Sequence, residues 1–174
     1  MADVILSLGT NLGDRAAYMR SMERELEKIL RAPISASTLF ETQPLGVTAD
    51  HPWYYNRLVS GTFEGTPYQL LAFCQAIESR LGRTRPEKYA PRTADIDIIL
   101  FEEVLLSDTR LTIPHPHVTD RRFLLEGLLE LAPEREVPGT GTTVREMVRR
   151  MDKEIAMQQM RPVEPEQTER HGTT

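Results

Sequence analysis

Two aspartates one residue apart, Asp95 and Asp97, are the strongest chemical signal in the sequence. They lie in an apolar run, residues 93–101, which predicts a β-strand. Because side chains alternate faces along a strand, both carboxylates should share one face, roughly 7 Å apart, while Ile98 and Leu100 face the core. Two like charges on one face of a strand repel each other, and a bound divalent cation would turn this repulsion into attraction to the metal. Mg²⁺ suits such a site, because it prefers one or two carboxylates plus phosphates and water. The alternative is a solvated strand face.

A basic segment directly precedes the aspartates. Its five cations are Arg80, Arg83, Arg85, Lys88 and Arg92. An arginine fork matches phosphate oxygens with paired hydrogen bonds, and carboxylates, metal and arginines together are typical of phosphoryl transfer. A solvated loop paired with Glu78 and Glu87 is the alternative.

Other features are weaker. Residues 9–13 (GTNLG) lack the lysine of a P-loop and predict a tight turn. His115, between two prolines, could contact a phosphate or be simply exposed. Tyr54 and Phe123 could stack on a flat ligand or belong to the core. The single cysteine, Cys74, falls on an apolar helix face and is interpreted as structural.

Hydrophobic periodicity predicts the elements that position these residues. Strands are expected over residues 4–8, 34–41, 54–63 and 93–101, with 104–106 as a hairpin partner of the last, and helices over 15–31, 67–81, 120–131 and 144–151. The order β-α-β-β-α-β predicts an α+β, ferredoxin-like antiparallel sheet with helices packed on its face, plus extra C-terminal helices. Residues 1–160 are expected to form one domain and residues 161–174 a polar, flexible tail.

Composition narrows the class of protein. The chain has 174 residues, a net charge of −5 and 40% hydrophobic residues, which suits one globular domain. The negative charge disfavours a protein whose main task is binding nucleic acid. No apolar run approaches the ~18 residues that span a bilayer, and the N-terminus lacks a signal-peptide pattern. A cytoplasmic, monomeric protein without membrane or nucleic-acid partners is expected.

Seven stretches occur in a fixed order along the chain: residues 9–14 (GTNLGD), 42–46 (TQPLG), 54–56 (YYN), 82–85 (GRTR), 91–97 (PRTADID), 111–116 (LTIPHP) and 121–123 (RRF). Together they resemble the motifs of the 6-hydroxymethyl-7,8-dihydropterin pyrophosphokinase family. The resemblance implies that the β,γ-pyrophosphoryl unit of ATP moves to the hydroxymethyl oxygen of the pterin, releasing AMP, in folate biosynthesis.

The resemblance also implies roles for individual residues. Asp95 and Asp97 would hold two Mg²⁺ ions, and Arg83 and Arg92 would contact the triphosphate as catalytic residues. The ATP site would contain Gln75, Glu78, Arg83, Arg85, Lys88, Arg92, Ile98, Arg110, Thr112, His115 and Arg121. The pterin would be bound by Thr42, Leu45, Tyr54, Asn56 and Phe123. Lys88 and Tyr89 depart from the family, since some members carry Arg and Trp there.

Two other functions remain open from the residues themselves. A metal-dependent phosphodiesterase could use the same carboxylates with water and would need no pterin pocket. A ferredoxin-like RNA-binding module could use Tyr54, Phe123 and the basic segment. Such modules usually carry an R/K-G-F-G-F type run, which this sequence lacks, and Asp95 and Asp97 would repel the RNA backbone. The reaction products distinguish these functions.

Overall fold

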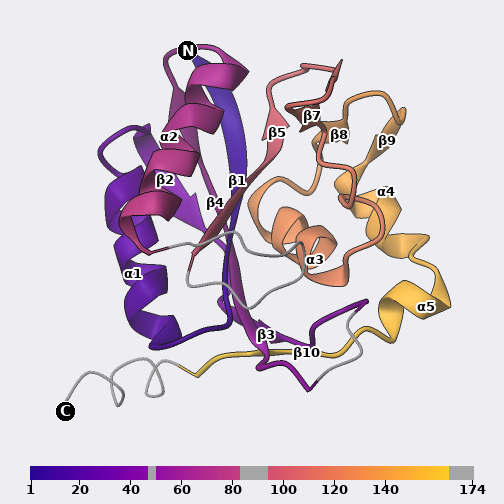
Figure 1. Cartoon of the computed structure of the whole chain (residues 1–174). Coiled ribbons are helices and arrows are strands. Elements are labelled where there is room, and N and C mark those ends of the chain that lie inside the picture. The colour runs from indigo at the N-terminus through magenta and orange to yellow at the C-terminus, as the bar shows by residue number, and fades with distance from the viewer. Residues whose placement is uncertain (47–49, 83–93, 165–174) are drawn as a thin grey trace.

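The computed structural model describes residues 1–46, 50–82 and 94–164. It is built around a six-stranded sheet with antiparallel pairings (Figure 1). The strands are β1 (Ala2–Thr10), β2 (Arg31–Ala36), β3 (Phe40–Thr42), β4 (Tyr54–Phe63), β5 (Asp95–Phe101) and β10 (Met160–Pro162). β1 lies between β4 and β5, the other edge of β4 pairs with β2 and β3, and β10 pairs with β3. This split βαβ arrangement confirms the predicted α+β, ferredoxin-like fold.

Helices α1 (Arg15–Leu26) and α2 (Pro67–Arg80) cover one face of the sheet (Figure 1). α2 begins, as predicted, with Thr66 as its N-cap: the Thr66 hydroxyl accepts from the Gln69 N–H, and the Gln69 side chain accepts from the Thr66 N–H. Beneath the two helices, β1 contributes Val4, Leu6 and Leu8 to the first core cluster. These three side chains are at most 1% exposed, so this face is closed to solvent.

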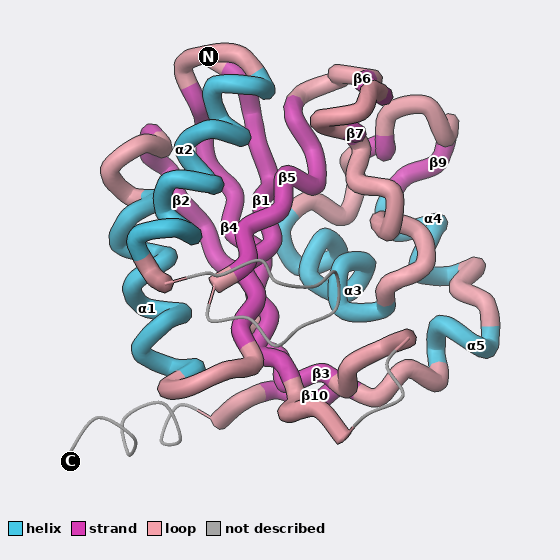
Figure 2. The backbone as a smooth tube through the Cα atoms, in the orientation of Figure 1, coloured by secondary structure: helices cyan, strands magenta, loops and turns pink. Residues whose placement is uncertain are grey.

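Helices α3 (Arg122–Leu131), α4 (Val144–Arg149) and α5 (Lys153–Ala156) lie on the other side of the sheet (Figure 2). Leu124 and Leu128 of α3 pack with Ile5 and Leu58 in the second core cluster. At Gly127 a Cβ would lie 2.9 Å from Leu58 Cδ1, so the glycine permits the close approach of α3 to β4. None of the described helices has the length and apolar character needed to cross a membrane.

Helix α1 ends at Leu26, earlier than the expected end at residue 31. Ile29 and Leu30 continue the helical spacing of apolar residues, but they lie in a turn and pack against the first core cluster. Their spacing therefore indicates that they are buried, and does not indicate that they are helical. The expected strand 34–41 is instead two strands, β2 and β3. β2 tolerates Pro33 because it pairs along one edge only, with β4.

Strand β5 carries a β-bulge that the alternation pattern does not predict. Its register against β1 shifts between Ile5 and Leu6, which pair with Leu100 and Ile98 respectively. The extra residue, Ile99, joins the second core cluster together with Leu100. The expectation that Leu100 shares the face of Ile98 is therefore wrong, because the bulge inserts one residue between them.

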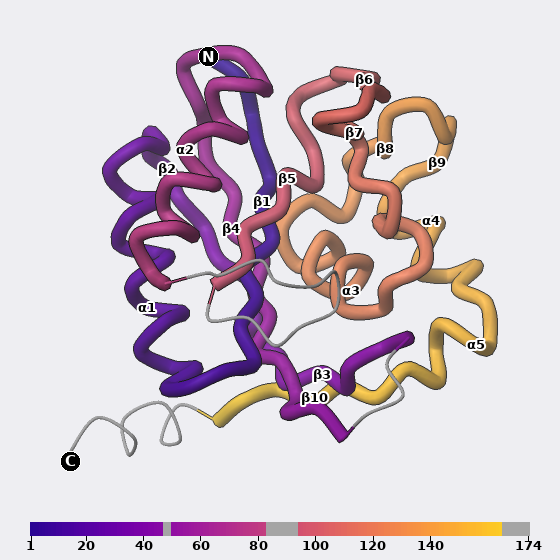
Figure 3. Tube along the Cα trace, in the orientation of Figure 1, coloured from indigo at the N-terminus to yellow at the C-terminus, as the bar shows by residue number. Residues whose placement is uncertain are grey.

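Two further expectations differ from the structure. β6 (Leu106–Ser107) pairs with β7 (Thr112–Ile113) rather than with β5, and a second hairpin joins β8 (Glu136–Val137) to β9 (Thr142–Thr143). β10 begins at Met160 and runs beside β3, so the start of the predicted tail belongs to the sheet (Figure 3). Residues 165–174 lie outside the described residues.

Candidate active site

A pocket of about 480 Å³ opens on the face of the sheet that carries α3. Alternate residues of β1, β4 and β5 form its floor, and the loop after β3, residues 115–124 and residues 158–160 form its walls. The lining residues are Ser7, Gly9, Thr42, Gln43, Pro44, Leu45, Gly46, Tyr54, Asn56, Asp95, Asp97, Ile99, His115, His117, Arg121, Arg122, Phe123, Leu124, Gln158, Gln159 and Met160.

The strand register explains why the floor residues meet. Gly9 of β1 pairs with Asn56 of β4 on one side and with Asp95 of β5 on the other. Ser7 lies opposite Asp97 in the same way. These positions alternate with the buried leucines of β1, so they face away from the core that α1 and α2 cover. Three strands therefore bring one amide and two carboxylates to one surface.

Asn56 is held in a fixed orientation on this floor. It is 6% exposed, and its Nδ2 donates to Thr42 Oγ1 over 2.6 Å. A Cβ on Gly9 would lie 2.9 Å from Asn56 Oδ1, so the glycine makes room for the amide. An amide carries two N–H donors and an accepting oxygen, and Thr42 uses one donor. The arrangement suits the edge of a planar ligand that offers both donors and acceptors.

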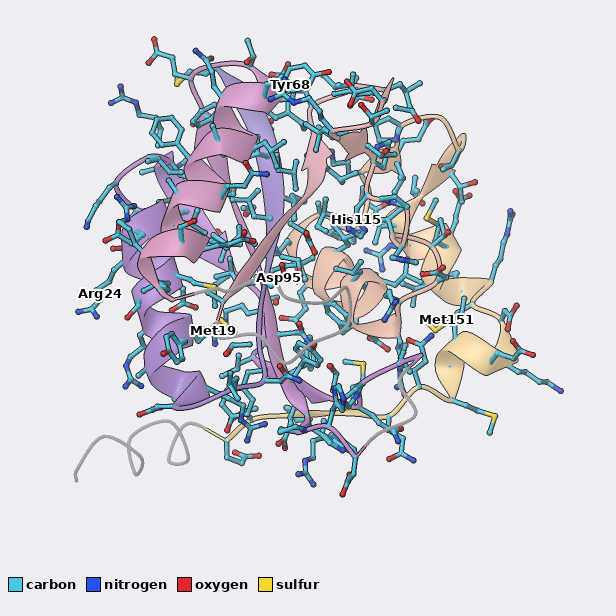
Figure 4. The ribbon with its side chains drawn as sticks, in the orientation of Figure 1. Met19, Arg24, Tyr68, Asp95, His115 and Met151 are labelled. Carbon is cyan, nitrogen blue, oxygen red and sulfur yellow. The ribbon has the colours of Figure 1, made fainter. Side chains whose placement is uncertain are left out.

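His115 approaches the carboxylates of β5 from the loop before α3 (Figure 4). Its Nε2 lies 3.8 Å from Asp97 Oδ2, and the Asp97 side chain is 47% exposed. The His117 N–H donates to His115 Nδ1 over 3.1 Å, so in the neutral ring the proton is on Nε2, toward Asp97. Burial, reinforced by the nearby His117, lowers the pKa of His115 to about 4. The imidazole is therefore an uncharged donor at neutral pH.

The donor set of Asp95 and Asp97 decides which metal could bind here. Within residues 1–46, 50–82 and 94–164, no group of three His, Cys, Asp or Glu side chains could hold a metal ion. Two carboxylates facing an open pocket match Mg²⁺, which commonly takes its other ligands from water and substrate phosphates. The residues present fit a divalent cation that binds together with an anionic substrate.

A second hollow, on the opposite face of β3, contains Arg15, Glu41 and Arg161. Glu41 pairs with both arginines, at 2.9 Å from Arg15 Nη1 and 2.7 Å from Arg161 Nη2. Burial raises the pKa of Glu41, but the hydrogen bonds from Arg161 and Arg15 outweigh it and leave this pKa below its ordinary value. The network joins α1, β3 and β10, with its cations already paired to a carboxylate.

Comparison with known sequences assigns the chain to a family. The profile of the 7,8-dihydro-6-hydroxymethylpterin-pyrophosphokinase (HPPK) family matches residues 5–133, which contain the whole pocket lining except residues 158–160. The chain belongs to the HPPK family. It is therefore an enzyme, a pyrophosphokinase that transfers a diphosphate group.

Curated HPPK relatives share this chain over most of its length. It is 37% identical over 156 residues to the 2-amino-4-hydroxy-6-hydroxymethyldihydropteridine pyrophosphokinase of Methylorubrum extorquens, covering 87% of this chain and 95% of the relative. The enzyme of the same name from Bacillus subtilis is 36% identical over 136 residues, covering 78% and 81%. Wild-type HPPK-DHPS of Plasmodium falciparum has a TM-score of 0.67 at 18% identity, covering 86% of this chain and 43% of that one. This last likeness shows the fold.

The pocket brings together many of the residues predicted for an HPPK site. From the metal and ATP set, the lining residues are Asp95, Asp97, His115 and Arg121. The predicted pterin residues Thr42, Leu45, Tyr54, Asn56 and Phe123 all line it. Residues far apart in the chain therefore meet in the lining of one pocket.

Three predicted nucleotide residues lie on or beside α2, outside this lining. Gln75 is exposed on the helix. Glu78 is 3% exposed, and its Oε1 accepts from the Ile96 N–H over 2.8 Å, which holds β5 against α2. Ile98 is 3% exposed within the first core cluster, so its side chain is committed to packing.

Two other predicted nucleotide residues lie near the hairpin β6–β7. The Arg110 guanidinium lies 5.0 Å from the centre of the Tyr68 ring, and Thr112 belongs to β7. Figure 4 shows Tyr68 well apart from Asp95. The predicted residues Arg83, Arg85, Lys88 and Arg92 lie outside the described residues.

Sequence reasoning missed several pocket residues, notably Ser7, Gln158, Gln159 and Met160. Ser7 could have been predicted from the sequence, because Ser7 and Gly9 share one face of a predicted strand. Residues 158–160 carry no local pattern, since the pairing of β10 with β3 brings them to the pocket.

Proposed function

We propose that this enzyme transfers the β,γ-pyrophosphoryl group of ATP to the hydroxymethyl oxygen of 6-hydroxymethyl-7,8-dihydropterin in folate biosynthesis. The oxygen attacks the β-phosphorus and releases its proton to solvent, while the bond from the β-phosphorus to the α,β-bridging oxygen breaks and AMP leaves with that oxygen. The observation that carries the proposal is the shared floor, in which Gly9 separates Asn56 from Asp95 across adjacent strands. A heterocycle on Asn56 could direct its substituent toward the carboxylates. The names of the bacterial relatives support the same substrate.

In this proposal the pterin occupies the end of the pocket formed by Asn56, Tyr54, Phe123 and the loop 42–46. The two aromatic side chains hold the ring by stacking, which contributes about 0.5–1.5 kcal/mol per pair beyond burial. Specificity comes mainly from Asn56, because a ligand that leaves a buried amide unpaired is strongly disfavoured. Thr42 fixes the amide, and Leu45 closes the edge of the pocket.

The phosphates occupy the other end, beside Asp95 and Asp97. These carboxylates would hold two Mg²⁺ ions, which neutralise the charge of the polyphosphate when bound. His115 offers an uncharged Nε2–H beside Asp97, suited to a phosphate oxygen. Arg121, whose side chain is 30% exposed, adds a cation from the same wall.

The remaining ATP contacts are proposed from the family resemblance. Arg83, Arg85, Lys88 and Arg92 would bind the triphosphate, and Arg83 and Arg92 would assist the transfer. Gln75, Glu78, Ile98, Arg110 and Thr112 would bind the nucleoside, with Ile98 acting through its backbone. The proposed enzyme is cytoplasmic and monomeric, with small-molecule substrates only.

A product assay tests the proposal. Protein, ATP, Mg²⁺ and the pterin are mixed, and AMP is quantified by chromatography. AMP formation should require both pterin and metal, and Asp97→Ala should lower the rate by about 10³-fold or more. Glu103→Ala, which removes an exposed carboxylate in the turn after β5, is the matched control and should leave the rate unchanged.

Two results would contradict the proposal. Hydrolysis of ATP or another phosphate ester at the same rate without pterin would assign the carboxylates to a metal-dependent phosphodiesterase. Folded wild-type protein that forms no AMP would exclude the pterin as the substrate.

A further inference from the structure

We infer that residues 156–162, here called the C-terminal strap, fix the spacing of the two walls of the pocket, with Gln158 as the positioning residue. The strap lies outside residues 5–133, which the family profile matches. The inference rests on the proposed function for the identity of the ligand, while the contacts of the strap stand independently of it.

One end of the strap holds the wall that carries Phe123. Gln158 Oε1 accepts from the Arg122 N–H over 2.9 Å, and Gln158 Nε2 donates to the Asp120 carbonyl over 2.7 Å. Arg122 Nη1 in turn donates to the carbonyls of Ala156, at 3.0 Å, and Gln158, at 3.2 Å. These contacts fix the backbone on which Phe123 sits.

The start of α3 depends on this side chain. The N-cap residue of α3, Arg121, makes no side-chain capping hydrogen bond. The first N–H groups of a helix have no partner within the helix, and Gln158 supplies one for Arg122 from a distant part of the chain. Gln158 therefore takes the place of an N-cap side chain for α3 and determines where this helix begins.

The other end of the strap holds the wall formed by β3 and its loop. The Gln159 carbonyl accepts from the Gln43 N–H over 3.1 Å, and Met160 pairs with Thr42. Arg161 adds its ion pair with Glu41 at 2.7 Å. This wall carries the proposed pterin contacts of loop 42–46.

Two adjacent residues, Gln158 and Gln159, are therefore bonded to opposite walls. Figure 3 shows the late segment running from α5 to β10, where it lies beside β3. A flat ring between the walls stacks well only at one spacing, so a shift of either wall weakens pterin binding. The carboxylates lie on β5, whereas the hydrogen bonds of Gln158 and the strand pairing of β10 described above reach residues 120 and 122 and β3. Arg121, which lies between the two residues that Gln158 contacts, is only one of several cations proposed for the phosphates. Loss of Gln158 should therefore affect the pterin more strongly than ATP.

Steady-state kinetics of full-length variants test this selectivity. Gln158→Ala should raise the KM for pterin about tenfold and leave the KM for ATP within about twofold, since it removes two hydrogen bonds. Gln158→Glu keeps the acceptor for Arg122 but loses the donor to Asp120, and should give a smaller rise. Met157→Ala, at a neighbouring side chain that is 79% exposed, is the control and should match wild type.

Amide hydrogen exchange, followed by NMR without ligand, tests the strap separately from the reaction. In Gln158→Ala the amides of Arg122 and Gln43 should both exchange about tenfold faster, while those of α2 keep their wild-type rates. Unchanged exchange at Gln43 would overturn the inference, as would equal rises in both KM values. An inactive wild type would refute the proposed function only, and the exchange at Gln43 would still decide the role of the strap.

Discussion

The two faces of β1 differ in what their residues contact. On the side of α1 and α2, Leu6 and Leu8 are fully buried in an apolar cluster. On the other side, Ile5 packs under α3, whereas Ser7 and Gly9 form the floor of the pocket. One strand therefore stabilises the fold with one set of positions and builds the site with the alternate set. Substitutions on the two faces should separate stability from activity.

Asp95→Asn should show this separation most strongly. It removes one of two like charges on a strand face, so the free energy of unfolding should stay the same or rise by up to about 1 kcal/mol. The rate of transfer should fall by about 10³-fold, because a proposed metal ligand loses its charge. Urea unfolding and AMP formation measure the two quantities on one preparation. A stability loss above about 1 kcal/mol would mean that the pocket face also stabilises the fold.

Leu6→Ala should have the opposite effect. Its side chain is fully buried, and its truncation should lower the free energy of unfolding by about 3–5 kcal/mol. The kcat and KM values of the molecules that remain folded should stay within about twofold of wild type. Asp3→Ala, at an exposed position of the same strand, is the control. A large change in KM at unchanged stability would show that the two faces are coupled.

Asn56→Ala distinguishes the two ends of the pocket. The KM for pterin should rise about 100-fold, because the ligand loses its polar partner, while the KM for ATP should not change. Thr42→Val keeps the shape of the side chain but removes the acceptor for Asn56 Nδ2, and should raise the pterin KM about fivefold. Equal effects on both substrates would contradict the division of the pocket into a pterin end and a phosphate end.

The smallest predicted effect is a pH-dependent change in stability caused by Cys74, which is buried on the side of the sheet that α1 and α2 cover. Burial, with smaller effects of Glu78 and Asp97, raises the pKa of this thiol to about 12 from its ordinary value of 9.0. Between these values the folded chain binds the proton and the unfolded chain releases it, so stability falls as pH rises. Relative to Cys74→Ala, wild type should lose about 1 kcal/mol more of its unfolding free energy between pH 9 and pH 10. Parallel pH profiles for the two proteins would mean that the thiol is accessible to solvent.

The sequence predicts the elements whose residues repeat with a clear period. β1, β4 and β5 follow from their apolar runs, α2 from Thr66 and Pro67, and the common face of Asp95 and Asp97 from alternation. These are local properties, so a single chain displays them. The predicted pterin residues line one pocket because each belongs to such an element or to its flanking loop.

The features that sequence reasoning missed depend on distant contacts. The bulge at Ile99 reflects how β5 fits against β1, and no local pattern marks it. The early end of α1 could not be read from Ile29 and Leu30, because burial gives a turn the same apolar residues as a helix. Gln158 lies in a polar stretch, and its role appears only when Asp120 and Arg122 are brought beside it.

The pairing of β10 with β3 also has a consequence for the order of events on the ribosome. Synthesis proceeds from the N-terminus, so β1, β4 and β5 can pair once residue 101 has left the exit tunnel. The second edge of β3 is paired only after residues 160–162 have been synthesised. Until then, the N–H and C=O groups of that edge can pair with another chain. The nascent protein therefore passes through a stage in which both carboxylates are in place and one wall of the pocket is still being made.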